Sequence, residues 1–157
     1  MNKFPYRKGV NILVLDEQNN YLLVQKTNFD SHQWGFPGGG SEEGDSPEDT
    51  VYRELKEELG STEFEIIYKS PIKIKFDWPK LDQEMGFKKH GKWYQGQEKY
   101  WYVVKYTGNK DNFNLQEEEI KNIKWVPYED LEKHLVFEGQ WDNVNSVIKD
   151  YKKSNNL

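Results

Sequence analysis

The sequence contains no cysteine among its 157 residues, and this absence excludes disulfide bonds, thiolate metal sites and cysteine nucleophiles. No stretch approaches the roughly 20 apolar residues that a membrane-spanning helix needs. Met1–Gly9 has no apolar run of the kind that a signal peptide carries. We therefore expect a cytoplasmic, monomeric protein with no membrane partner. We expect one domain over residues 1–157, with 152–157 as a frayed tail.

Acidic residues outnumber basic ones, and the net charge is −5. A negative net charge argues against an extended nucleic-acid surface. The charge is unevenly spread, however. Residues 69–105 carry nine lysines against four acidic residues, so this segment is +5 and the remainder of the chain is −10. A basic segment beside an acidic site suits a polyphosphate ligand. A solubilising loop explains part of this pattern equally well.

The pattern of apolar residues predicts a mixed sheet flanked by helices, without internal repeats. Strands are expected at Val10–Leu15 and Tyr21–Gln25 (as a hairpin), Phe64–Tyr68, Ile72–Phe76, Glu98–Thr107 and Ile123–Val126. Helices are expected from Pro127 to Leu135 and around Val144–Tyr151, where apolar residues have helical spacing. The segment Asp77–Gly91 mixes proline, glycine and charge, and is expected to be a long loop or lid.

The stretch Trp34–Gly60 is the most informative, because it joins a glycine-rich loop to an acidic helix. Ser46 is a typical N-cap, and Pro47 suits the first helical position. Asp49 can pair with Ser46 by reciprocal hydrogen bonds in a near-capping box. Gly60 suits the position just past the helix end. Three apolar residues recur every fourth position and are expected to face the core: Val51, Leu55 and Leu59.

Three glutamates lie at positions i, i+3 and i+4 of this helix, so that their carboxylates gather on one face: Glu54, Glu57 and Glu58. Like charges at these spacings repel by a few tenths of a kcal/mol per pair. A divalent cation would turn that repulsion into coordination. The alternative is a solvated acidic face with Arg53 and Lys56 as counterions. The preceding Gly38–Gly40 favours the metal site, because such a loop can hold a pyrophosphate and its Mg²⁺.

The stretch resembles the signature of the Nudix hydrolases, Gly-x5-Glu-x7-Arg-Glu-U-x-Glu-Glu-x-Gly-U, where U is a bulky aliphatic residue. The matching residues are Gly39, Arg53-Glu54-Leu55, Glu57-Glu58 and Gly60. Asp45 replaces the first glutamate, and Ser61 stands where an aliphatic residue is usual. The resemblance implies an α/β (α+β) fold, an α/β/α sandwich with a mixed β-sheet. It also implies a metal-dependent hydrolase of nucleoside diphosphate linkages.

Shorter pieces resemble one branch of that family, the bacterial RNA pyrophosphohydrolases and the related dinucleoside polyphosphate hydrolases. These pieces are Tyr6-Arg7, Gly96–Tyr102, Glu119 ahead of Trp125-Val126, and Phe137. Three features depart from the branch. Gly38 stands where glutamine is usual, Lys99-Tyr100 replaces a Gln-Lys pair, and Glu138-Gly139 follows Phe137 in place of basic residues.

The resemblance implies a site for Mg²⁺ or Mn²⁺ with these residues: Gly39, Glu54, Glu57, Glu58 and Glu119. One of the glutamates would activate the attacking water, and Arg53 would orient them by charge-assisted hydrogen bonds. The candidate substrate-binding residues are Arg7, Lys26, Gly38, Gln97, Lys99, Tyr102 and Phe137. Several have a plainer alternative: a solvated acidic run for Glu119, solvated surface for Arg7 and Lys26, and packing for Gln97, Tyr102 and Phe137.

These residues and the resemblance lead to three competing hypotheses for the function. The leading hypothesis is removal of pyrophosphate from RNA 5′ ends or asymmetric cleavage of dinucleoside polyphosphates. The second is housecleaning hydrolysis of free (d)NTPs or nucleotide sugars, which Gly38 mildly favours. The third is a catalytically silent nucleotide-sensing module, and the intact glutamate cluster argues against it.

Overall fold

The computed structural model describes residues 4–157, so the first three residues of the Met1–Gly9 segment lie outside the described part. The strands are β1 (Tyr6–Leu15), β2 (Tyr21–Lys26), β3 (Gly38–Gly40), β4 (Phe64–Asp77), β5 (Gly96–Tyr106) and β6 (Ile120–Val126). The helices are α1 (Pro47–Leu59), α2 (Lys80–His90), α3 (Tyr128–His134) and α4 (Gln140–Ser154), with a 3₁₀ turn at Lys110–Asn112. No helix in residues 4–157 is long and apolar enough to span a bilayer.

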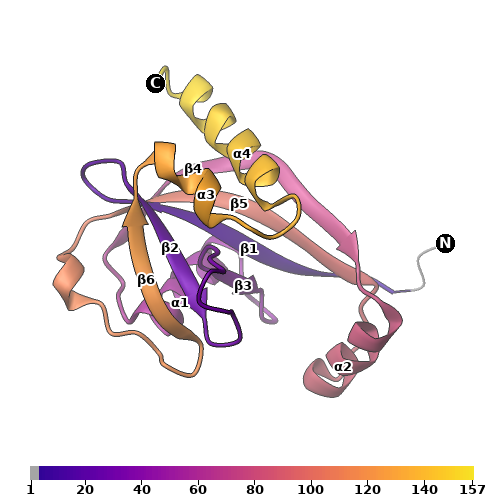
Figure 1. Ribbon diagram of the computed structural model, residues 1–157. Helices are drawn as coiled ribbons and strands as arrows, with labels where there is room; N and C mark the ends of the chain where they lie inside the picture. Colours follow the sequence, from indigo (N-terminus) through magenta and orange to yellow (C-terminus); the bar gives the residue numbers. More distant parts are fainter. Residues whose placement is uncertain (1–3) are drawn as a thin grey trace.

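The strands form one mixed sheet in the order β4-β5-β1-β2-β6 (Figure 1). β1 runs parallel to β5, and the other pairs are antiparallel. β1 has two partners on its other side. Its end pairs with β2 at Leu15–Tyr21, whereas its middle pairs with β3, where Asn11 lies opposite Gly38. The glycine-rich loop is therefore anchored to the sheet through β3.

Helices cover both faces of this sheet, which confirms the predicted α/β/α sandwich. α1 packs on one face, where its apolar residues meet Ile12 and Val24. α3 and α4 pack on the other face against Leu13, Leu23 and Trp101 (Figure 1). The α1 residues that meet the sheet are fully buried: Val51, Leu55 and Leu59. Burial of each such side chain contributes roughly 1.5–3 kcal/mol, so α1 is firmly fixed to the sheet.

The ends of α1 lie where the sequence predicts them. Ser46 accepts a hydrogen bond from the Asp49 N–H at 3.0 Å, and the Asp49 carboxylate accepts one from the Ser46 N–H at 3.2 Å. This reciprocal pair is a capping box with aspartate in place of glutamate. At the other end Gly60 adopts the left-handed conformation (φ 70°), and its N–H donates to the Lys56 carbonyl.

The segment Asp77–Gly91 is not the long loop that its composition predicted. β4 continues to Asp77, and Lys80–His90 forms α2, which ends at Gly91 in the left-handed conformation. Three basic residues in its last turn favour the helix through its dipole: Lys88, Lys89 and His90. Figure 1 shows α2 as a lobe beyond the edge of the sandwich.

Two further expectations need correction. The strands predicted at Phe64–Tyr68 and Ile72–Phe76 are one continuous strand, β4, whose register against β5 shifts twice. The predicted frayed tail begins too early, since Lys152–Ser154 belongs to α4. β3 was not predicted at all, because three consecutive glycines carry no strand propensity.

Candidate active site

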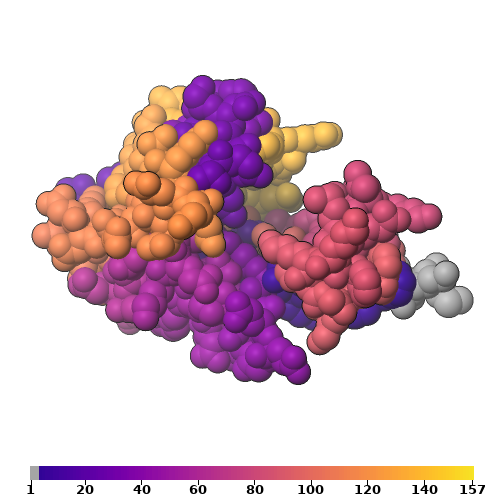
Figure 2. All heavy atoms as spheres, turned by 90° about the horizontal axis from the view of Figure 1, so that it is seen from below, coloured from indigo at the N-terminus to yellow at the C-terminus, as the bar shows by residue number. Residues whose placement is uncertain are grey.

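Acidic and basic side chains meet in an open cleft of about 370 Å³. Its acidic wall comes from α1 and the turn before β6, and its basic wall comes from β1, β2 and α2. The three glycines of β3 line the cleft between these walls. Figure 2 shows this face of the molecule, which is hollowed between the α2 lobe and the rest of the body.

Three carboxylates converge in the cleft, from Glu54, Glu58 and Glu119, each offering one oxygen within 4.8 Å of the others. Glu54 and Glu58 are i and i+4 on α1, and are only 8% and 2% exposed, whereas Glu119 is exposed. The backbone of Glu119 is fixed by β2, since its carbonyl accepts from the Thr27 N–H at 3.0 Å. A carboxylate distant in sequence therefore completes a pair that the helix supplies.

Glu58 is the most constrained of the three. Its Oε1 accepts a hydrogen bond from the Gly38 N–H at 3.3 Å. Its Oε2 is buried and has no hydrogen-bond partner within residues 4–157. Burial raises the pKa of Glu58 to about 8, with repulsion from Glu54 and Glu119 adding to the shift and Lys26 opposing it. Burial also raises the pKa of Glu54. A buried carboxylate oxygen without a donor is an open position for a cation.

The glycines allow the loop to approach these carboxylates. A Cβ on Gly39 would meet the carboxylate of Glu54 at 2.4–2.7 Å, closer than any real contact. Gly38 has φ 153° and would place a Cβ against the carbonyl of Val10. Only glycine therefore fits at Gly38, where the obstacle is backbone, whereas a side chain at Gly39 would displace the Glu54 carboxylate.

Arg53 ties the helix to the glycine loop. Its Nη2 donates to the Gly40 carbonyl and to Asp45 Oδ2, both at 2.9 Å, and its Nε donates to the same Asp45 oxygen at 3.1 Å. The pKa of Asp45 is lowered by a backbone hydrogen bond and by this guanidinium. The Nη1 of Arg53 lies 3.2 Å from Glu54 Oε1. Aspartate thus keeps the ion pair at a position where the family signature has glutamate, and Arg53 positions the loop and the carboxylates.

Glu57 lies apart from the three converging carboxylates. Its side chain is 45% exposed and its Oε2 is 3.3 Å from Arg53 Nη1. The helix places Glu57 outside the cleft lining, beside the arginine that also contacts Glu54. The predicted three-glutamate face of α1 is present, but tertiary structure brings Glu119 rather than Glu57 close to Glu54 and Glu58.

Several predicted substrate contacts gather on the basic side of the cleft. Arg7, Lys26, Gly38 and Gln97 line it directly. Lys99 follows Gln97 by two residues on β5, so both side chains lie on the same face of the sheet. The pKa of Lys99 is lowered to about 8 by burial and by Lys26, with Glu58 and Glu54 opposing the shift. Its ammonium is therefore part of the same electrostatic group.

Two predicted contacts do not line the cleft. Tyr102 is fully buried in the core under α1 and donates a hydrogen bond to Glu48 at 3.2 Å. Tyr102 is three residues from Lys99 on β5, so it faces the opposite side of the sheet. Phe137 packs on Phe29 with ring centroids 5.1 Å apart. The structure therefore places Tyr102 in the core and Phe137 against Phe29.

Two polar side chains of the cleft were not identified from sequence. Lys89 reaches the cleft from α2, and Asn28 lines it just after β2. The excess of lysines in residues 69–105 was a signal for Lys89, but the treatment of α2 as a loop hid its position. Asn28 carries no signal of its own in the sequence.

Comparison with known proteins agrees with this geometry. The sequence profile of the NUDIX domain matches residues 5–146. The chain is 31% identical over 142 residues to an RNA pyrophosphohydrolase of a Nitratiruptor species, covering 87% of this chain and 88% of that protein.

Among solved structures, the fold is similar to the Escherichia coli dihydroneopterin triphosphate pyrophosphohydrolase. The TM-score is 0.67 at 13% identity, covering 93% of this chain and 99% of that chain. It is also similar to a Caenorhabditis elegans Ap4A hydrolase binary complex, with a TM-score of 0.64 at 17% identity, covering 92% and 98%. These two likenesses concern the fold alone.

Proposed function

The chain belongs to the Nudix hydrolase family, and we propose that it is a metal-dependent pyrophosphohydrolase that removes pyrophosphate from RNA 5′ ends or cleaves dinucleoside polyphosphates. The observation that carries this proposal is the buried, unpartnered Oε2 of Glu58, beside two further carboxylates in a cleft with a basic wall. The 31% identity to an RNA pyrophosphohydrolase supports the choice of substrate.

The donor set fits a hard divalent cation such as Mg²⁺ or Mn²⁺, because it consists of carboxylate oxygens. Glu54, Glu58 and Glu119 would hold the ion, with the backbone of Gly39 beside them and Glu57, outside the cleft lining, as a further proposed ligand. When bound, the ion would neutralise phosphate charge and lower the pKa of a coordinated water.

The residues of the chain would then act in three ways. Arg7, Lys26 and Lys99 would bind phosphate oxygens and hold the phosphorus in line with the attacking water. One glutamate of the cluster would accept the proton of that water. The water oxygen forms a bond to phosphorus as the bridging P–O bond breaks, and the leaving phosphate departs with the electron pair. Arg53 acts through the glutamates that it positions.

A second candidate, hydrolysis of a free nucleotide, is supported by a pocket of about 180 Å³ lined by Asn11, Phe36, Trp101 and Asn143 among others. The buried indole N–H of Trp101 has no partner within residues 4–157. Asn11 lies opposite Gly38 in the sheet, so the pocket adjoins the cleft. Amides and an indole N–H are groups that can hydrogen-bond the edge of a nucleobase.

The experiment is a product analysis with purified protein and Mg²⁺. The substrates are 5′-triphosphorylated RNA, diadenosine tetraphosphate, canonical and oxidised dNTPs, and nucleotide sugars, and the released phosphates are identified. We expect strong turnover of the first two substrates. Preference for a dNTP that Asn143→Ala selectively lowers would favour the second candidate. No turnover of any substrate would favour the nucleotide-sensing module.

Substitutions of single carboxylates test which of them serve the reaction. Glu57→Gln and Glu119→Gln are expected to lower turnover at least about 100-fold if both carboxylates serve the reaction. Glu118→Gln is the matched control, because Glu118 is the exposed neighbour of Glu119 and its side chain makes no hydrogen bond or ion pair within residues 4–157. Its backbone carbonyl accepts from the Thr27 hydroxyl. Equal activity of the Glu118 and Glu119 variants would show that Glu119 is a solvated acidic residue without a role in the reaction.

A further inference from the structure

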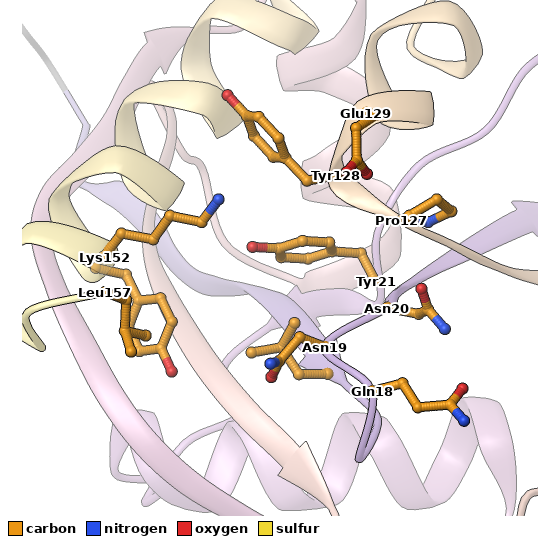
Figure 3. Close-up of a pocket in the computed structure, with 11 residues that line it drawn as sticks. Gln18, Asn19, Asn20, Tyr21, Pro127, Tyr128, Glu129, Lys152 and Leu157 are labelled. Atoms are coloured by element: carbon orange, nitrogen blue, oxygen red, sulfur yellow. The ribbon is translucent and has the colours of Figure 1, made fainter.

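A second pocket, of about 340 Å³, lies at the other end of β2 from the cleft. Tyr21 opens β2 and lines this pocket, whereas Lys26 ends β2 and lines the cleft. Six residues of extended strand span roughly 17–20 Å, so the two sites are separate. The pocket is bounded by the β1–β2 turn, the start of α3 and the end of α4 (Figure 3).

Two tyrosine hydroxyls in this pocket have no partner. Tyr21 and Tyr151 are 3% and 9% exposed, yet neither hydroxyl makes a hydrogen bond to any residue of 4–157. Burial raises the pKa of both phenols, so each hydroxyl stays protonated and able to donate at neutral pH. Tyr128 differs, because its hydroxyl donates to Asn145 at 2.6 Å. Both hydroxyl oxygens reach solvent in the pocket, because the buried side-chain atoms that lack a partner in residues 4–157 are Glu58 Oε2 and Trp101 Nε1. Each hydroxyl can therefore donate to a ligand there.

A cation lies beside these hydroxyls. The ammonium of Lys152 is 3.9 Å from the ring centroid of Tyr128 and pairs with no carboxylate in the part of the chain that the structure describes. Figure 3 shows the Lys152 ammonium and the Tyr21 hydroxyl directed into the same space, from α4 and β2. One carboxylate, that of Glu129, also lines the pocket, and it disfavours ligands with more than one negative charge.

The lining of the pocket is mixed, with apolar groups beside the polar side chains of the β1–β2 turn. Leu15, Leu157 and the tyrosine rings supply flat apolar surface. The turn beside them is held by Asp16, whose Oδ1 accepts from the N–H groups of Gln18 at 2.9 Å and Asn20 at 2.8 Å. A space of this size, with an apolar part beside polar groups that converge on it, has properties of a small-molecule site.

We infer that this pocket binds a small planar aromatic carboxylate, with the carboxylate on Lys152 and the hydroxyls of Tyr21 and Tyr151, and the ring against the apolar wall. The single cation matches a single negative charge. Two hydroxyls and one ammonium can satisfy the lone pairs of one carboxylate. This site is additional to the proposed hydrolase function and does not depend on it.

The test uses a matched pair of probes, indole-3-acetate and its neutral amide, indole-3-acetamide, with the full chain. Binding is followed by calorimetry and by backbone amide NMR shifts. We expect saturable binding of the acetate, with shifts at residues 15–21, 127–129 and 151–157. We expect the amide to bind at least about tenfold more weakly than the acetate. Glu58→Gln should leave this binding unchanged.

Variants identify the groups. Lys152→Met removes the ammonium and Tyr21→Phe removes one hydroxyl while keeping the ring, and each should weaken the acetate about tenfold. Lys153→Met is the control, because Lys153 is exposed and does not line the pocket. Thermal melting of each variant establishes that it is folded. Equal affinity for the two probes, shifts confined to the cleft, or no binding at millimolar concentration would each overturn the inference.

Discussion

Metal binding should release a proton from Glu58 at neutral pH. The pKa of this carboxyl is raised to about 8, chiefly by burial, so without metal it is about 90% protonated at pH 7 and about 10% at pH 9. A cation binds the deprotonated carboxylate. Binding should therefore release about 0.9 proton at pH 7 and about 0.1 at pH 9. The affinity should rise roughly tenfold per pH unit up to pH 8 and level off above it.

The measurement is calorimetric titration of Mg²⁺ or Mn²⁺ in two buffers of different ionisation enthalpy, at pH 7 and pH 9. The difference in apparent enthalpy between the buffers gives the number of protons released. Glu58→Gln, which cannot titrate, should bind metal weakly and without this pH dependence. A proton release near zero at pH 7 for the unaltered protein would refute the assignment of Glu58 as a buried, protonated ligand.

The same shift has a consequence for stability without metal. Because the pKa of Glu58 is above its ordinary value of 4.5, the folded protein binds an extra proton between pH 4.5 and 8. Stability without metal should therefore fall as pH rises through this window, by up to about 4–5 kcal/mol. Glu58→Gln should remove the fall, and should melt higher than the unaltered protein in EDTA at pH 8 while losing activity.

Other substitutions test the loop, the ion pair and the core. Gly39→Ala should weaken metal binding at least tenfold with little change in melting temperature, because its methyl group would displace the Glu54 carboxylate; unchanged affinity would contradict this. Arg53→Lys cannot donate to Gly40 and Asp45 together, so turnover should fall more than tenfold, with a stability loss of about 1–3 kcal/mol in urea unfolding. Leu55→Ala should cost about 2–5 kcal/mol by the same assay.

Much of the candidate site could be predicted because it is local in sequence. The ends of α1 follow from Ser46, Pro47 and Gly60, whose side chains or conformations act within one turn of the helix. The spacing of Glu54 and Glu58 places both carboxylates on one side of α1 by helical geometry alone. The burial of Leu55 and its apolar neighbours follows from the same periodicity.

Long-range contacts were not predictable in this way. Glu119 is 61 residues from Glu58, and the two are brought together by the pairing of β6 with β2 and by the hydrogen bond from the Gln116 N–H to the Glu58 carbonyl. Tyr102 looked like a pocket residue because it lies in a motif with Gln97. The alternation of β5 instead turns it into the core under α1. α2 was missed because its apolar and charged residues have no amphipathic period, so only its packing and end signals support it.

The sequence by itself determined the α/β class, the acidic helix and the family, because these depend on short-range periodicity, capping and residue identity. Only the tertiary structure decided which carboxylates converge, that Lys89 faces them from α2, and that the tyrosines Tyr21 and Tyr151 line one pocket at the far end of β2. The physical reason is that burial and charge proximity arise when distant segments pack together. The same packing raises the pKa of Glu58 and thereby prepares it to exchange a proton for a metal ion.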